Sequence, residues 1–212
     1  FQQINRVRME NLRSRISPHF TFNVLGREIN QFNGSEEVKH NLMELVKYLR
    51  RSLELTEKLS VSLQDELDFV RTYIELERGR VGEDFVATVT VEDGLDATRI
   101  MIPSMIVQIP VENAIKHGLA GKDGKKELSV YVSRETNGIR ITVTDNGRGY
   151  LPQVVSATRG TGTGLKVLYQ TIQLLNTKNK SDKIRFDITN RSDGQTGTEV
   201  SVYIPFRFSY DL

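Results

Sequence analysis

A run of alternating glycines is the clearest sign of chemistry in this sequence. Gly160, Gly162 and Gly164 alternate with threonines, and Leu165 then opens a helical pattern of apolar residues. Glycines at this spacing let backbone N–H groups approach an anion closely, and a helix N-terminus adds partial positive charge. The run suits a triphosphate, although glycines before a helix are as often only a flexible loop. A P-loop is excluded, because it needs Lys and then Ser or Thr after the last glycine.

Three further segments carry polar residues that could bind a nucleotide. They are residues 112–117 (Glu-Asn-Ala-Ile-Lys-His), residues 145–149 (Asp-Asn-Gly-Arg-Gly) and Gly197-Thr198. The Asp145 carboxylate follows a strand pattern and could accept a hydrogen bond from an adenine amino group. The same segment could be a plain turn, since Asp, Asn and Gly are common turn formers. The Asn113 amide oxygen could bind magnesium, or Asn113 could be an ordinary surface residue.

His19 is one of the three histidines of the chain. It falls near an apolar stripe that contains Leu12, Ile16 and Phe22, a position that by itself favours a core histidine. An imidazole with an ordinary pKa of about 6.5 is mostly neutral at pH 7 and carries a nucleophilic lone pair.

The elements that must position these residues fall into two parts, and the first is helical. Apolar stripes run along residues 9–32 and 38–53, with a bend expected at Pro18, and Asn33-Gly34-Ser35 ends one helix and caps the next. Such a helical hairpin has too little core to be stable alone. Two copies paired into a four-helix bundle would bury both stripes, so we expect a homodimer. A third helix is predicted from Ser62.

The second part has the period of two that strands require. We predict strands at 86–91, 128–133, 139–144, 184–189 and 199–204 and helices at 104–117 and 165–175, with a hairpin turn at Asn137-Gly138. This order predicts an α+β sandwich, a mixed sheet with helices on one face. Gly79 and Gly82 interrupt the pattern, which places the boundary between residues 1–80 and residues 81–212.

Composition narrows the possible partners and surroundings. The net charge of +2 gives no field that favours nucleic acid, and the absence of cysteine excludes a disulfide framework. The longest apolar stretch, residues 100–111, is too short for a membrane span, which needs about 20 residues. The chain opens on Phe1 inside a helical pattern, so we expect it to be a fragment that continues upstream.

Taken together and in this order, the four glycine- and polar-rich segments resemble the N, G1 and G2 boxes and the closing Gly-Thr of the GHKL, or Bergerat-type, ATP-binding fold. Histidine kinases, gyrase-type ATPases and Hsp90 share this fold, and the resemblance covers residues 84–206. It implies ATP and Mg²⁺ as ligands. Asn113 would hold Mg²⁺ and Lys116 would contact phosphate. Asp145 would bind the adenine amino group, with Thr198 nearby.

The resemblance also assigns roles to the remaining residues of the four segments. The residues that would shape the pocket floor or close over the triphosphate are Gly147, Gly149, Gly160, Gly162, Gly164 and Leu165. Residues 150–160 would form a mobile lid, since such loops commonly close on ligands. His117 would either line the pocket or merely end its helix.

Residues 18–23, Pro-His-Phe-Thr-Phe-Asn, look like the P-H-F-x-F-N signature of LytS-like sensor histidine kinases, and the likeness continues along nearly the whole chain. The resemblance implies that His19 is the phosphoacceptor and that an aspartate of a response regulator receives the phosphoryl group next. It also implies a cytoplasmic part whose membrane attachment lies upstream of the first helix. The sequence departs from the family at Thr21 and at Pro110, where the proline stands one place later than usual.

The sequence leaves open which residues assist catalysis and which of several related functions the chain performs. Asn23, one helical turn beyond His19, could orient the ring, and Glu112 could act as base or water positioner or be a plain solvated carboxylate. The chain could instead be a GHKL ATPase, or a catalytically silent dimerisation scaffold. Ile109 stands where gyrase-type ATPases carry their catalytic Glu, which argues against efficient hydrolysis.

Overall fold

The computed structural model describes residues 29, 34–149, 163–179 and 181–210. His19, Asn23, Gly160, Gly162, the predicted bend at Pro18 and the predicted lid at residues 150–160 lie outside these ranges. Two compact units divide the chain after Leu59, and the second unit runs from Ser60 to Asp211.

The described part of the first unit consists mainly of the helix α3 (Glu36–Thr56). Ser35 caps it, because its side chain accepts the Val38 N–H at 3.3 Å, and Glu36 and Glu37 occupy the first turn, where the helix dipole favours negative charge. The predicted start of the second helix is confirmed. Two residues of its predicted apolar stripe, Val38 and Leu45, remain 44% and 43% exposed.

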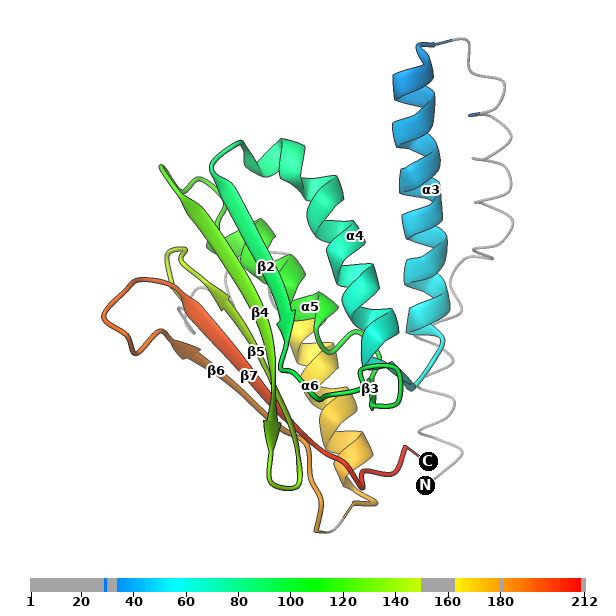
Figure 1. Ribbon diagram of the computed structural model, residues 1–212, viewed down its shortest axis with the longest axis vertical. Helices are drawn as coiled ribbons and strands as arrows, with labels where there is room; N and C mark the ends of the chain where they lie inside the picture. Colours follow the sequence, from blue (N-terminus) through cyan, green and yellow to red (C-terminus); the bar gives the residue numbers. More distant parts are fainter. Residues whose placement is uncertain (1–28, 30–33, 150–162, 180, 211–212) are drawn as a thin grey trace. The chain divides into compact units, whose positions relative to one another are not determined.

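A five-stranded mixed sheet forms the body of the second unit. The strands lie in the order β2 (Phe85–Val91), β4 (Lys126–Glu135), β5 (Gly138–Asp145), β7 (Thr198–Pro205) and β6 (Arg185–Asn190). β2 and β4 are parallel, and the other neighbours are antiparallel. The helices α4 (Leu63–Val81), α5 (Gln108–Asn113) and α6 (Thr163–Asn176) cover one face (Figure 1). The predicted mixed sheet with helices on one face is confirmed.

The core lies between this sheet and the helices. On β5, Ile139, Ile141 and Val143 are buried, while the alternate residues are partly exposed, as the period of two requires. Leu67 and Val70 of α4 are fully buried from the other side. Full burial of such a side chain stabilises the fold by roughly 1.5–3 kcal/mol. A helix that follows Ser62 was predicted, and Ser62 is its N-cap.

The second unit begins at Ser60 and includes α4. It therefore begins before the domain boundary that the glycines at 79 and 82 suggested. Gly79 does not interrupt α4, which continues to Val81 and ends at Gly82 with a φ of 114°. The short sheet of β1 (Ser60–Ser62) and β3 (Met101–Pro103) was not predicted. Its strands are too short to show a period in the sequence.

The hairpin between β4 and β5 turns one residue earlier than predicted. Gly138 is paired with Glu135 across the hairpin, so the two turn residues are Thr136 and Asn137. Gly138 is required by the neighbouring strand rather than by the turn. A Cβ added there would lie 2.3 Å from the carbonyl oxygen of Ile204 on β7.

The helix predicted at 104–117 begins later and changes type. Residues 104–107 form a turn with Met105 at a φ of 67°, α5 begins at Gln108, and the π-helix η1 (Ala114–Gly118) completes the segment. Pro110 therefore falls in the first turn of α5, where its missing N–H costs no helical hydrogen bond.

No helix in the described ranges is long and apolar enough to cross a membrane.

Candidate nucleotide site

The carboxylate of Asp145, at the end of β5, is the centre of the site. Its side chain is buried, and Oδ1 accepts the Gly147 N–H at 2.8 Å and the Thr198 N–H at 3.4 Å. Burial raises the pKa of Asp145, while its hydrogen bonds with Gly147 and Thr198 act in the opposite direction. A buried carboxylate held by backbone donors is a rigid acceptor for a ligand's amino group.

The end of η1 lies against this carboxylate. A Cβ added to Gly118 would lie 2.9 Å from Asp145 Oδ1, and one added to Gly147 would lie 2.1 Å from the Gly118 carbonyl oxygen. The Arg148 N–H donates to the same carbonyl at 3.3 Å. Only glycines allow the two segments to approach this closely, so the N-box and G1-box segments are brought together as the motifs imply.

The third side of the site is the start of β7. Gly197 has a φ of 137°, and a Cβ on it would lie 1.9 Å from the Asp145 carbonyl oxygen. Gly149 also has positive φ, at 86°, and a Cβ there would lie 2.8 Å from the side-chain oxygen of Asn190 on β6. Asp145, Gly147, Gly149 and Thr198 therefore meet in one place, although Thr198 lies 53 positions after Asp145.

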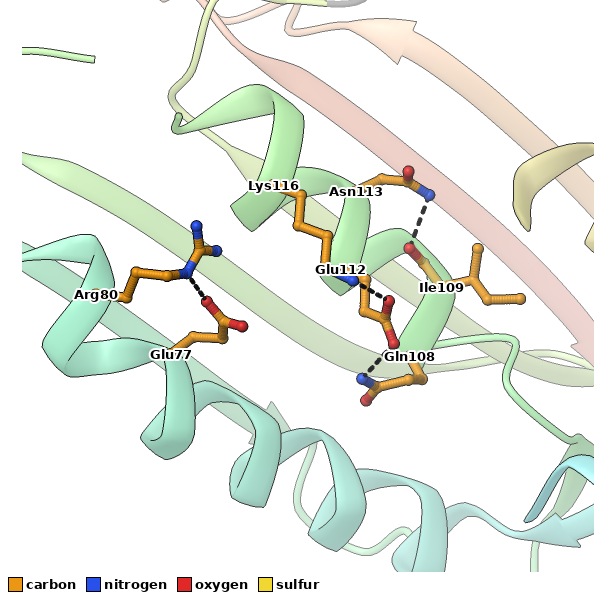
Figure 2. Close-up of polar contacts among 7 residues, drawn as sticks. All are labelled: Glu77, Arg80, Gln108, Ile109, Glu112, Asn113 and Lys116. Carbon is orange, nitrogen blue, oxygen red and sulfur yellow. Dashed lines mark hydrogen bonds and ion pairs between the residues drawn. The ribbon is translucent and has the colours of Figure 1, made fainter. Parts of the chain in front are cut away.

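The side chains of α5 and η1 form a second group of polar contacts (Figure 2). Asn113 Nδ2 donates to the Ile109 carbonyl at 2.8 Å, which turns the amide oxygen of Asn113 away from Ile109. Glu112 is held from two sides, because Gln108 Nε2 donates to its Oε1 at 3.1 Å and Lys116 Nζ donates to its Oε2 at 2.7 Å. Lys116 can contact a phosphate only by sharing or leaving this carboxylate.

The π-helix sets the end of this segment. The Leu119 N–H donates to the Ala114 carbonyl at 2.8 Å, the wide turn that defines a π-helix. π-helical turns are frequent at functional sites. His117 lies in this turn with an exposed side chain. The pKa of His117 is lowered, mainly because its ring is partly removed from water and secondarily because the positive charges of Lys116 and Arg148 lie nearby.

The start of α6 lies close to α5. The helix begins at Thr163, two residues before the predicted start, so Gly164 and Leu165 are in its first turn. A Cβ on Gly164 would lie 3.4 Å from Cγ2 of Ile109, the residue whose carbonyl holds Asn113. Gly164, the last glycine of the run, therefore lies near Asn113, the predicted magnesium ligand.

The donor set fits ATP with Mg²⁺. Asp145 supplies a buried acceptor for an amino group, and Asn113 supplies an amide oxygen of the kind that Mg²⁺ accepts. Within the described ranges, no three His, Cys, Asp or Glu side chains gather as a metal site. A single amide oxygen such as that of Asn113 is enough for Mg²⁺, which commonly takes only one or two protein ligands and completes its shell with substrate phosphates and water.

Sequence reasoning missed two residues that build the site. Gly118 follows the N-box segment, and its contact with Asp145 has no local signal in the sequence. Glu66, on α4, accepts the backbone N–H groups of Met105, Val107 and Gln108 and so holds the start of α5. Only its place in a helical apolar stripe could have indicated that Glu66 is buried.

Known proteins match both parts of the chain. The histidine kinase family model matches residues 7–85, and the model of histidine kinase-, DNA gyrase B- and HSP90-like ATPases matches residues 98–207, more than half of the chain. Among curated relatives, the sensor histidine kinase YpdA of Escherichia coli K12 is 28% identical over 205 residues, covering 96% of this chain and 35% of that protein.

The sensor histidine kinase/phosphatase LytS of Staphylococcus aureus MRSA252 is 30% identical over 207 residues, covering 93% of this chain and 34% of LytS. The chain thus spans about a third of the length of these relatives. Full-length ShkA in complex with AMPPNP matches with a TM-score of 0.50 at 18% identity, over 98% of this chain and 46% of ShkA. At that identity the match shows a common fold. The chain belongs to the family of histidine kinase-, DNA gyrase B- and HSP90-like ATPases, and its residues 7–85 match the histidine kinase family.

Proposed function

We propose that this chain is the catalytic part of a sensor histidine kinase that uses ATP to phosphorylate its own His19. The observation that carries the proposal is the buried Asp145 carboxylate, enclosed by Gly118, Gly147 and Thr198 in the unit that also contains Asn113. The match of residues 7–85 to the histidine kinase family supports His19 as the acceptor, since His19 lies within that range.

In this proposal the site divides ATP binding between two elements. Asp145 accepts a hydrogen bond from the adenine amino group, while the amide oxygen of Asn113 binds Mg²⁺ and Lys116 contacts phosphate. Bound Mg²⁺ neutralises charge that develops on the phosphates during transfer. The glycines 160, 162 and 164 close over the triphosphate.

The transfer step is an in-line displacement. One ring nitrogen of neutral His19 donates its lone pair to the γ-phosphorus, a nitrogen–phosphorus bond forms, and the bond to the bridging oxygen breaks so that ADP leaves. The proton on the other ring nitrogen must then find an acceptor, for which Glu112 is the candidate. Asn23 orients the ring through its amide oxygen. Because the transition state is loose, catalysis consists mainly of positioning and charge neutralisation.

The proposal includes partners. An aspartate of a response regulator receives the phosphoryl group, and a second copy of the chain completes a four-helix bundle through the apolar stripe of α3. Exposed Val38 and Leu45 support this pairing. ATP is cytoplasmic, so the proposal places this part of the protein in the cytoplasm, with membrane attachment through sequence upstream of Phe1.

Incubation with γ-labelled ATP and MgCl₂ tests the proposal. We expect the 212-residue chain to take up acid-labile label, because a nitrogen–phosphorus bond is hydrolysed in acid. His19→Gln should take up none and still bind ATP. His40→Gln is the matched control, because His40 lies exposed on α3, and it should be labelled as the wild type is.

The other outcomes separate the alternatives. Release of free phosphate without labelled protein would identify a GHKL ATPase instead of a kinase. A wild-type chain that binds no nucleotide would be a dimerisation scaffold. Label retained in His19→Gln would place the phosphoryl group on another residue.

A further inference from the structure

We propose that Glu66 of α4 is a positioning residue of the nucleotide site, which fixes the start of α5 and thereby the placement of Asn113. This inference rests on the proposed function, because it assumes that Asn113 binds Mg²⁺ in complex with ATP. Glu66 itself lies outside the four nucleotide-binding motifs and outside the pair of histidine and asparagine at 19 and 23.

The contact is direct and enclosed. Glu66 Oε2 accepts the Met105 N–H at 2.8 Å, and its Oε1 accepts the N–H groups of Val107 at 2.9 Å and Gln108 at 3.2 Å. The Glu66 side chain is fully buried. The carboxylate belongs to α4, and the amides lie 39 to 42 positions later in the chain.

The start of α5 depends on this carboxylate because its own sequence supplies no cap. The first N–H groups of a helix have no partner within the helix, and a side chain at the N-cap usually accepts from one of them. The N-cap of α5 is Val107, which makes no side-chain cap bond. Glu66 thus replaces a missing local cap from another helix, and its negative charge suits a helix N-terminus.

The first turn that Glu66 holds is also the turn that holds the site side chains. Gln108, whose N–H reaches Glu66, donates from Nε2 to Glu112. Ile109, the next residue, accepts from Asn113 at its carbonyl (Figure 2). A shift of the turn would therefore move Glu112 and Asn113 together, whereas Asp145 sits on a strand of the central sheet and would stay in place.

Stability alone does not favour an ionised carboxylate at this position. Burial raises the pKa of Glu66 to about 7, against the lowering effect of the bonds from Val107, Met105 and Gln108. With the folded-state pKa above the ordinary 4.5, the stabilisation is fully present below pH 4.5 and is lost as the pH rises through about 7. At pH 8 the ionised Glu66 carboxylate therefore lowers the stability of the fold. What it contributes is the set of hydrogen bonds that it accepts from the N–H groups of Met105, Val107 and Gln108.

ATP binding with and without Mg²⁺ separates positioning from mere stability. The quantity to measure is the ratio of the ATP affinity in MgCl₂ to the ATP affinity in EDTA, in the 212-residue chain at pH 8. We expect this ratio to be roughly tenfold smaller in Glu66→Gln than in the wild type, because an amide has one oxygen for three donors. The ATP affinity in EDTA, which depends on Asp145, should change less than about twofold. Glu75→Gln is the matched control on α4, since Glu75 is mostly exposed and pairs with Arg78.

A ratio unchanged in Glu66→Gln would overturn the role, as would equal losses with MgCl₂ and with EDTA that follow a lower melting temperature. If Glu66→Gln does not fold, Glu66→Asp keeps the charge on a shorter side chain and should show the same decrease of this ratio. Wild-type chain that binds ATP under neither condition would refute the proposed function itself, a result distinct from a failure at Glu66.

Discussion

At the scale of single residues, adenine recognition depends on which atoms Asp145 presents. Oδ1 is occupied by the N–H groups of Gly147 and Thr198. An amide at this position would keep its oxygen on those donors and would turn its NH₂ group toward the nucleotide. Two donors would then face each other, the NH₂ group of the protein and the amino group of adenine.

We expect Asp145→Asn to bind ATP roughly 10- to 100-fold more weakly, as a buried donor left without an acceptor costs about 1–3 kcal/mol. The variant should also lose its preference for ATP over ITP, since the 6-carbonyl of ITP accepts from an amide. Isothermal titration calorimetry with both nucleotides measures the two effects. Asp187→Asn, on an exposed position of β6, is the control. Unchanged selectivity in Asp145→Asn would assign the adenine end elsewhere.

At the scale of elements, the site depends on how closely η1 approaches the end of β5. The carbonyl of Gly118 lies where a Cβ of residue 147 would be, so a side chain there must push the two elements apart. The position of Pro110 within its helix is also set by contacts between elements. Pro110 stands in the first turn of α5 because Glu66 and the positive φ of Met105 start the helix late.

We expect Gly147→Ala to lower the free energy of unfolding by roughly 1–3 kcal/mol and to weaken ATP binding, because η1 must shift. Gly79→Ala serves as the control, since no atom lies within 4 Å of an added Cβ. In a helix interior that change should raise stability by roughly 0.5–1 kcal/mol. Urea unfolding of both variants measures the difference, and a Gly147→Ala variant as stable as the wild type would contradict the close contact.

At the scale of the whole molecule, pairing of two copies would cover the apolar stripe of α3. Leu45, 43% exposed, lies seven positions after Val38, which places both on one helix face. Leu45→Glu should therefore yield monomers, whereas His40→Glu, at an exposed position on the opposite face of α3, should not. Size-exclusion chromatography with light scattering reports the mass of each. A wild-type chain that is monomeric at micromolar concentration would refute the pairing.

Much of this architecture could be predicted from local pattern. The period of two gave the five strands of the large sheet, the helical stripe with Ser62 gave α4, and Ser35 marked the start of α3. Asp145, Gly147, Gly149 and Thr198 were predicted as one site and do meet. His19 and Asn23 stay predictions. The β4–β5 turn was predicted one residue too late, because Gly138 is needed for its close approach to β7 and does not belong to the turn.

The sequence by itself determined the five strands of the large sheet, the helices α3, α4 and α6, and which residues could bind a nucleotide, since periodicity and motif spacing are local properties of the chain. Only the tertiary structure decided where α5 begins, that η1 is a π-helix, and that Gly118 and Glu66 support the site. Those features arise from contacts between residues far apart in the chain, such as Glu66 with Gln108, 42 positions away. A backbone amide that bonds to a distant carboxylate leaves no trace in its own neighbourhood of the sequence.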